Sequence, residues 1–177
     1  MADLNIEEVN KKIENPIENI DRLKGFEIIA ETLVSKIYDV FGRNTLLNIL
    51  YQIGSAPGEI IANRIKVNYE KEDFEVLDCF EVLLKELKEF YSIRINEVEE
   101  DDQKIRFLIH NHCFLREPIK HREKLEFGKA LCRANKGYFE TAFKILLGNK
   151  IKKVEINFLE NDEEHDACLE EVMFYKL

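Results

Sequence analysis

Three of the four cysteines in this 177-residue chain lie where the sequence pattern would bring their side chains together. Cys113 ends a segment of alternating apolar residues, and Cys168 opens another. Cys132 lies on the apolar face of a predicted helix, in register with the aromatic residues that follow it. Three thiolates and one further ligand suit a tetrahedral Zn²⁺ ion. The sequence therefore predicts a zinc site that includes these three cysteines.

The fourth zinc ligand has two candidates in the sequence. His165 precedes Cys168 by three residues, and Glu160 is expected on the inner face of the neighbouring strand. No Cys-x-x-Cys pair occurs, so the spacing by itself carries no zinc-finger signal. The competing interpretation is that every cysteine is an ordinary buried residue. Cys79 is interpreted in that way, because it lies on a predicted helix among large apolar side chains.

The remaining histidines give weaker indications. His110 and His112 alternate outward on one predicted strand, an arrangement that can bind a metal but is more typical of a solvated face. His121 lies in a predicted loop. The segment Gly54–Gly58 lacks the Lys-Ser/Thr ending of a phosphate-binding loop, and no nucleophile elbow with a Ser-His-Asp order occurs. These motifs do not point to catalysis, and an enzyme is the less favoured class.

The elements that would position these residues are two hairpins and several helices. Apolar and polar residues alternate with a period of two in four segments, which acidic turns join in pairs, and this predicts two antiparallel hairpins. A long helix over about 123–147, ended by Gly148, is predicted between them. The predicted strands are 92–98, 104–113, 151–160 and 167–176. The fold class is therefore α+β, with an antiparallel sheet from two hairpins packed against several helices.

The first half of the chain is predicted to be helical. Residues 1–25 form a helical arm that packs on the body or on a partner, or else a frayed extension. From Phe26 the apolar spacing is that of an amphipathic helix ended by Gly42, and 71–90 is the clearest helix of the chain. Between them Gly54–Gly58, which contains a proline, breaks a helix by propensity. We expect two helical pieces at a tight junction there; the alternative is one helix that bends where another backbone approaches closely.

Large apolar side chains are expected between the long helix and the sheet. Most such surfaces are solid core, and some leave a pocket for an apolar ligand. We expect a small hydrophobic molecule to bind in this layer. The predicted lining residues are Phe107, Phe127, Phe139, Phe143, Ile156 and Phe158.

Charge and composition disfavour several classes of function. The formal net charge is −9, and no basic stripe offsets it, which disfavours nucleic-acid binding by this chain. No apolar run is long enough to span a membrane, and the acidic start lacks a signal segment. We therefore expect a cytoplasmic protein, in which a disulfide framework is not expected.

Three segments of the C-terminal half carry a family resemblance. In IRFLIHNHC a strand ends in Cys113, and in LEFGKALCRANKGYFETAFKILLG a helix opens with Cys132 and Gly137. In VEINFLENDEEHDAC a strand-turn-strand unit reaches Cys168. Together with ILYQIGSAPGEIIANRI, these segments resemble the 4-vinyl-reductase domain family. The resemblance covers residues 26–177, which we expect to form one ligand-binding domain.

The resemblance implies an α+β fold shared with small subunits of the TRAPP vesicle-tethering complex and with haem-based nitric-oxide-sensor domains. It also implies a homodimer, a small hydrophobic ligand and a zinc ion held by cysteines and a carboxylate. Two positions depart from the family pattern: Glu160 stands where a cysteine is expected, and Lys136 replaces a carboxylate before Gly137. The favoured function is a sensor-type binding domain with a structural zinc site. The alternatives are an enzyme or accessory protein acting on a tetrapyrrole vinyl group, and a dimeric scaffold of the vesicle-tethering type.

Overall fold

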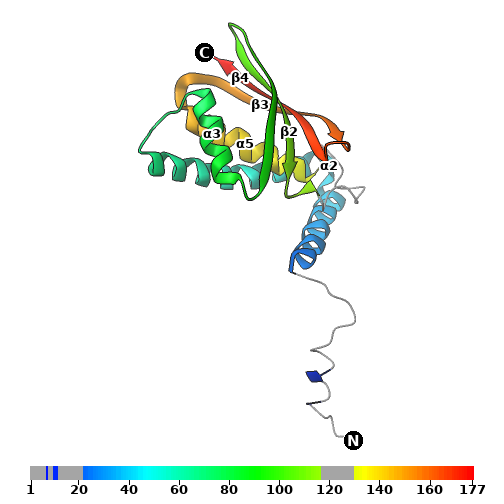
Figure 1. Ribbon diagram of the computed structural model, residues 1–177. Helices are drawn as coiled ribbons and strands as arrows, with labels where there is room; N and C mark the ends of the chain where they lie inside the picture. Colours follow the sequence, from blue (N-terminus) through cyan, green and yellow to red (C-terminus); the bar gives the residue numbers. More distant parts are fainter. Residues whose placement is uncertain (1–6, 8–9, 12–21, 117–129) are drawn as a thin grey trace, which may run out of the picture. The chain divides into compact units, whose positions relative to one another are not determined.

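The computed structural model describes residues 7, 10–11, 22–116 and 130–177 (Figure 1). The chain divides into two compact units, Met1–Leu33 and Val34–Leu177, and the sheet belongs to the second unit. Most of the arm expected at residues 1–25 lies outside the described residues. None of the helices described here has the length and apolar character to cross a membrane.

The helix α2, Arg22–Tyr69, consists of two helices joined at Gly42. Gly42 has φ 75° and ψ 173°, a conformation that suits glycine because it has no Cβ. The predicted helix end at Gly42 is therefore confirmed. Gly25, the last residue of the range expected to form the arm, lies inside α2.

The segment Gly54–Gly58 continues α2 without a break, so the expected junction of two helical pieces is wrong. The reason is the close approach of another backbone. A Cβ on Gly54 would collide with the carbonyl of Ala134, and a Cβ on Gly137 would collide with the carbonyl of Tyr51. These glycines let two helices cross with their backbones in contact. Tertiary packing therefore outweighs the unfavourable helix propensity of glycine and proline here.

The sheet has four antiparallel strands in the order β1-β2-β4-β3 (Figure 1). Both predicted hairpins are present, and pairing of β2 with β4 joins them into one sheet. The strands are β1 Tyr91–Glu100, β2 Lys104–Cys113, β3 Ile151–Asp162 and β4 Ala167–Lys176.

Two helices pack on one face of this sheet. They are α3, Val76–Leu87, and α5, Leu131–Leu147, which the 3-10 helix η2, Gly148–Lys150, connects to β3. α5 ends at Gly148 as predicted, with a φ of 57°, while its expected start lies outside the described residues. The predicted α+β fold, with a helix between two hairpins, is confirmed.

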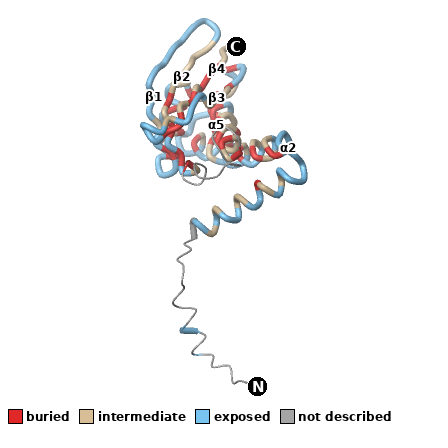
Figure 2. The backbone as a smooth tube through the Cα atoms, turned by 90° about the vertical axis from the view of Figure 1, so that its right-hand side faces the viewer, coloured by how far each residue is buried: buried red, intermediate tan, exposed pale blue. Residues whose placement is uncertain are grey.

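The core lies where the sheet meets these helices (Figure 2). The ring of Phe80 in α3 stacks on Phe107 in β2 with 4.6 Å between centroids. The ring of Phe143 in α5 meets Phe174 in β4 edge to face at 5.2 Å. Such pairs add about 0.5–1.5 kcal/mol each to the energy of burial. The core therefore ties α3 and α5 to the two central strands.

Candidate functional site

A small cavity lies between the helices and the inner face of the sheet, in the layer where the sequence predicts a ligand. It offers about 10 Å³ to the centre of a water molecule, roughly the room that one water needs. Seven of its lining side chains are apolar, and the two polar ones, Asn111 and Glu170, come from neighbouring strands. The apolar lining consists of Phe80, Ile93, Ile109, Phe139, Phe143, Ile156 and Val172.

Asn111 and Glu170 form a buried polar pair in this apolar layer. Asn111 is 1% exposed and Glu170 is 3% exposed. The Nδ2 of Asn111 donates a hydrogen bond to Glu170 Oε1 at 3.1 Å, but Asn111 Oδ1 has no partner among the described residues. A buried polar atom without a partner costs about 1–3 kcal/mol. The oxygen is therefore ready to accept a hydrogen bond from a water or a ligand.

Burial also controls the charge of Glu170. Removal from water raises the pKa of this carboxyl to about 8, and the hydrogen bond from Asn111 opposes the shift only in part. At neutral pH the side chain is therefore mostly protonated. A protonated carboxyl both donates and accepts hydrogen bonds, so the pair presents neutral groups of both kinds.

The predicted lining residues fall into three groups. Phe139, Phe143 and Ile156 line the cavity. Phe107 lies behind it, stacked on Phe80. Phe158 packs instead in a second apolar cluster, which contains Cys132, Leu46 and Leu50. Phe127 lies outside the described residues.

Sequence reasoning missed the polar pair. The signal was present, since Asn111 has the same strand parity as Ile109 and Cys113, and Glu170 has that of Cys168 and Val172. Period-two alternation therefore places both polar side chains on the inner face. The prediction considered only the apolar members of each face.

The three cysteines of the predicted zinc site are buried and lie within electrostatic reach of one another. The pKa of the Cys168 thiol is raised to about 12, mainly by burial and to a lesser extent by the nearby acidic groups Glu170, Cys132 and Cys113. Among the described residues the three sulfurs do not form a group within 4.8 Å of one another. A zinc ion with Zn–S bonds of about 2.3 Å would draw them closer.

A buried arginine lies beside the last of these cysteines. The guanidinium of Arg116 donates to Cys168 Sγ at 3.6 Å, to Asn161 Oδ1 at 2.7 Å and to Asp166 Oδ1 at 2.8 Å. Arg116 is 5% exposed. A fixed cation therefore already lies near the thiol and holds the turn of the second hairpin.

Neither expected fourth ligand points toward the cysteines. The pairing of β3 with β4 shifts register between Phe158 and Glu160, and Glu160 is exposed rather than on the inner face. A bulge of this kind breaks the alternation on which the expectation rested. His165 is also exposed, and its Nδ1 lies 2.8 Å from Asp162 Oδ2.

Comparison with known proteins identifies the fold but not a family. No family model matches the sequence, and no curated protein matches it. The phenol-responsive sensory domain of the transcription activator PoxR, solved with phenol, is similar with a TM-score of 0.58 and 15% identity, over 85% of this chain and 74% of that one. A trafficking protein particle complex subunit 3 from Naegleria fowleri, covalently bound to palmitic acid, has a TM-score of 0.55 and 12% identity, over 86% and 93%. The chain therefore has the fold of a small-molecule-binding sensory domain and of a trafficking-complex subunit.

Proposed function

We propose that this chain is a sensor-type domain that binds a small hydrophobic molecule carrying one hydrogen-bond donor. The observation that carries the proposal is the cavity between α5 and the sheet, with its apolar walls and the unpartnered Asn111 Oδ1. The PoxR sensory domain, which has a similar fold, was solved with phenol, and this supports a small-molecule ligand for this chain. Membership of the 4-vinyl-reductase family remains a prediction from the sequence.

The chemistry of the cavity favours a neutral ligand of the phenol or alcohol type. Its hydroxyl would donate to Asn111 Oδ1 and lie near the protonated Glu170. The remaining ligand surface would leave water for the apolar walls, at about 25 cal/mol per Å². An anionic ligand is disfavoured, because its charge would lie unpaired in the same apolar layer.

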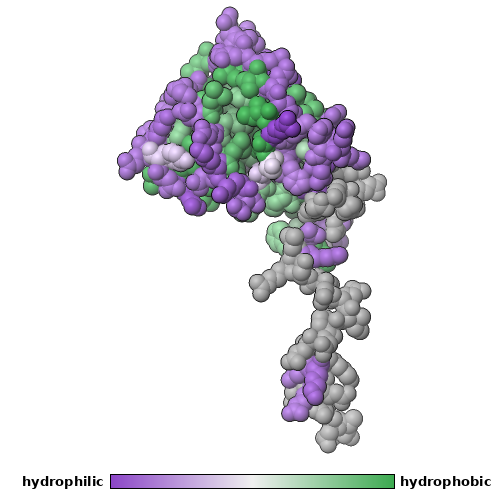
Figure 3. All heavy atoms as spheres, viewed as in Figure 1, coloured by the Kyte–Doolittle hydropathy of each residue, from purple (hydrophilic) through white to green (hydrophobic). Residues whose placement is uncertain are grey.

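Ligand entry requires the walls to move, since the cavity as it stands holds about one water. Apolar side chains gather on the face formed by α3 and β1 (Figure 3). Exposed apolar residues of these two elements include Leu77, Ile95 and Val98. Because Phe80 of α3 and Ile93 of β1 line the cavity, we propose that the ligand enters between these elements. The resulting displacement of a helix from the sheet would be the signal to a partner.

Phenol and toluene make a matched pair of probes, because they share a ring and differ in the donor. Calorimetric titration should show that phenol binds about 3–10-fold more tightly, which corresponds to one hydrogen bond of about 0.5–1.5 kcal/mol. Asn111→Leu should abolish that preference. The control Asn157→Leu, at the outward residue that donates to Glu171 Oε2, should retain it. If phenol and toluene both fail to bind the folded wild-type chain, the proposal is wrong.

We also propose a zinc ion held by Cys113, Cys132 and Cys168, as the sequence pattern and the family resemblance suggest. Their burial and closeness support it, since a cation would displace the thiol protons and stabilise all three thiolates. Metal binding would have to displace the Arg116 guanidinium from Cys168 and recruit a fourth ligand other than the exposed Glu160. Metal analysis of protein purified without a histidine tag tests it. A folded, metal-free wild-type chain contradicts it.

A dimeric scaffold is the second candidate function, and two observations favour it. The cavity is small, and one face of α2 is apolar and exposed: Ile53, Ile60 and Val67 are 55%, 70% and 75% exposed. Their spacing of seven residues puts them on one stripe, which we propose a second copy covers. Light scattering should find a dimer that Ile60→Glu converts to a monomer. A dimer that binds neither probe would favour the scaffold over the sensor.

A further inference from the structure

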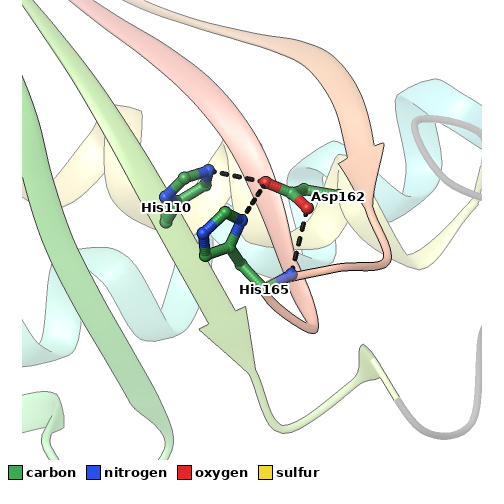
Figure 4. Close-up of side chains that lie close together, drawn as sticks. All are labelled: His110, Asp162 and His165. Atoms are coloured by element: carbon green, nitrogen blue, oxygen red, sulfur yellow. Dashed lines mark hydrogen bonds and ion pairs between the residues drawn. The ribbon is translucent and has the colours of Figure 1, made fainter.

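A compact group of metal-ligating side chains lies on the opposite face of the sheet from the cavity (Figure 4). His110 Nε2 lies 2.9 Å from Asp162 Oδ2, and His165 Nδ1 lies 2.8 Å from the same oxygen. The two imidazole rings stack with 4.9 Å between centroids. The ligand atoms all lie within 4.8 Å of one another, and among the described residues this is the one such group of three or more.

We propose that His110, Asp162 and His165 bind a divalent transition-metal ion such as Zn²⁺, Ni²⁺ or Co²⁺. Imidazole nitrogens and a carboxylate oxygen are typical ligands of these ions. Three protein ligands leave further coordination positions for water or another molecule. The site is separate from the cysteines, because His110 projects from the outer face of β2 and Cys113 from the inner face.

The fold brings His110 together with Asp162 and His165, which lie near each other in a distant part of the sequence. His110 pairs across the sheet with Leu169 of β4, and Asp162 pairs with Ala167 at the start of the same strand. The turn between β3 and β4 carries His165 back over β4 toward the outer face of β2. Sequence spacing alone gave no reason to combine His110 with His165.

The acidic member of the group is held in place and kept charged. The backbone N–H of His165 donates to Asp162 Oδ1 at 3.1 Å, and the carbonyl of Asp162 accepts a hydrogen bond from Arg116 at 3.3 Å. The hydrogen bond from the His165 backbone is the main reason that the pKa of Asp162 lies below its usual value. The carboxylate is therefore ionised at neutral pH and fixed beside both rings.

Binding of a metal would replace protons that the rings now share with the carboxylate. Each ring nitrogen that faces Asp162 would then direct its lone pair at the ion, and any proton on it would leave or move to the other ring nitrogen. The other nitrogen of His110, Nδ1, lies 3.1 Å from Asn96 Nδ2. Rotation of the Asn96 amide would present its oxygen to an Nδ1–H, which is the outer-sphere support that ligating histidines usually have.

The local charge also favours a cation. The turn that holds Asp162 and His165 contains Glu163, Glu164 and Asp166, within a chain of net charge −9. Clusters of one charge raise the local concentration of the opposite ion. The alternative is that the group is a hydrogen-bonded clasp for the hairpin and binds no metal, so the experiment must separate binding from stability.

The test is a calorimetric titration of the untagged chain with Ni²⁺, repeated with single alanine variants. The wild-type chain should bind one ion per chain at this site. Loss of an outer-sphere partner alone costs about 10–100-fold in metal affinity, so His110→Ala and His165→Ala should each cost at least roughly tenfold. The matched control is His112→Ala, two residues along the same outward face, where the ring bonds to Asp166 rather than to Asp162. It should leave the affinity unchanged.

Two further readouts distinguish the possible outcomes. Co²⁺ bound by nitrogen and oxygen should lack the strong thiolate charge-transfer absorption that the cysteine site would produce. His165→Asn is a milder change that should still fold if the alanine variant does not. Thermal unfolding of the metal-free variants measures how much the hydrogen-bonded clasp contributes to stability. The proposal is overturned if the wild-type chain binds no Ni²⁺, if both histidine variants retain its affinity, or if His112→Ala weakens it equally. If the histidine variants lose stability but keep their Ni²⁺ affinity, the three side chains form a hydrogen-bonded clasp and not a metal site.

Discussion

Glu170 and Glu171 are adjacent on β4, yet the two faces of the sheet hold them in opposite states. Glu170 is buried against apolar walls, and its pKa is raised to about 8. The pKa of Glu171 is lowered, mainly by the hydrogen bond from Arg106. Each carboxyl also accepts a hydrogen bond from an asparagine of the neighbouring strand, Asn111 at 3.1 Å or Asn157 at 3.2 Å. Burial therefore sets the charge of Glu170 and the hydrogen bond from Arg106 sets that of Glu171, whereas the asparagine bond that both receive does not decide it.

This difference separates two kinds of chemistry within one sheet. The inner face offers neutral hydrogen-bonding groups in an apolar layer, which suits an uncharged small molecule. The outer face offers ionised carboxylates with arginine and histidine partners, which suits ions. A strand that alternates its side chains can therefore serve two sites without mixing them.

The largest expected difference in stability is between two variants that each lose an aromatic ring, one on the inner face of the sheet and one on the outer face. Phe143→Ala removes a fully buried ring and should lower the free energy of unfolding by about 3–5 kcal/mol. Tyr175→Ala, on the outer face, should cost about 1 kcal/mol or less. Urea denaturation of both variants measures the difference. Equal losses would mean that the inner face is not the core of the fold.

Phe143→Ala also tests the cavity, because the deleted ring lines it. If the variant stays folded, it should bind toluene more tightly than the wild-type chain does, since apolar cavities of this kind accept apolar rings. Tyr175→Ala should not change toluene binding. An unchanged toluene affinity in both variants would contradict a ligand site in this layer.

The next effect is the pH dependence that Glu170 imposes on stability. Its carboxyl binds a proton up to about pH 8 when folded and only below about 4.5 when unfolded. Between these two pH values the folded chain therefore binds one proton more than the unfolded chain. Its free energy of unfolding should fall as the pH rises, by up to about 1.4 kcal/mol per pH unit. Glu170→Gln should remove this slope. Denaturation of the wild-type chain and the variant from pH 5 to 8 measures it, and an unchanged slope would contradict the buried neutral carboxyl.

The sequence predicts those parts of the fold that depend on local pattern. Alternation within a strand and an acidic turn identify both hairpins, and Gly42 marks a helix end through its own backbone conformation. The continuity of α2 through Gly54–Gly58 could not be predicted, because it depends on the backbone of α5. Local propensity opposes a helix there, and a contact between segments far apart in the sequence outweighs it.

The candidate sites likewise include parts that the local sequence pattern predicts and parts that depend on the assembled sheet. Parity places Asn111 and Glu170 on the inner face, so the sequence held enough information for the polar pair. Glu160 leaves its expected face because of a register shift, which sequence alternation does not record. His165 meets His110 because a turn folds over β4, and that geometry exists only in the assembled sheet.

Glu171→Gln, the matching substitution on the outer face, should change the pH dependence of stability by a smaller amount and in the opposite direction to Glu170→Gln. The lowered pKa of Glu171 gives stability above its unfolded pKa, and this is lost as the pH falls through the folded value. Glu171→Gln should therefore lower stability at pH 7 by less than about 1 kcal/mol, because solvent screens the partly exposed pair. The difference from wild type should shrink below about pH 4.5, where protonation begins. Unfolding curves that differ equally at pH 4 and pH 7 would contradict the ion pair with Arg106.

The smallest expected effect concerns Asn96, which contacts His110 without being a proposed ligand. Asn96→Ala should lower Ni²⁺ affinity by up to about tenfold, at the weak end of outer-sphere effects because the residue is exposed. It should leave phenol binding unchanged, since the ligand lies on the other face. Asn157→Ala, on β3, is the control and should alter neither affinity. Parallel titrations with Ni²⁺ and phenol measure both, and a change in phenol affinity with Asn96→Ala would show that the two faces do not act independently.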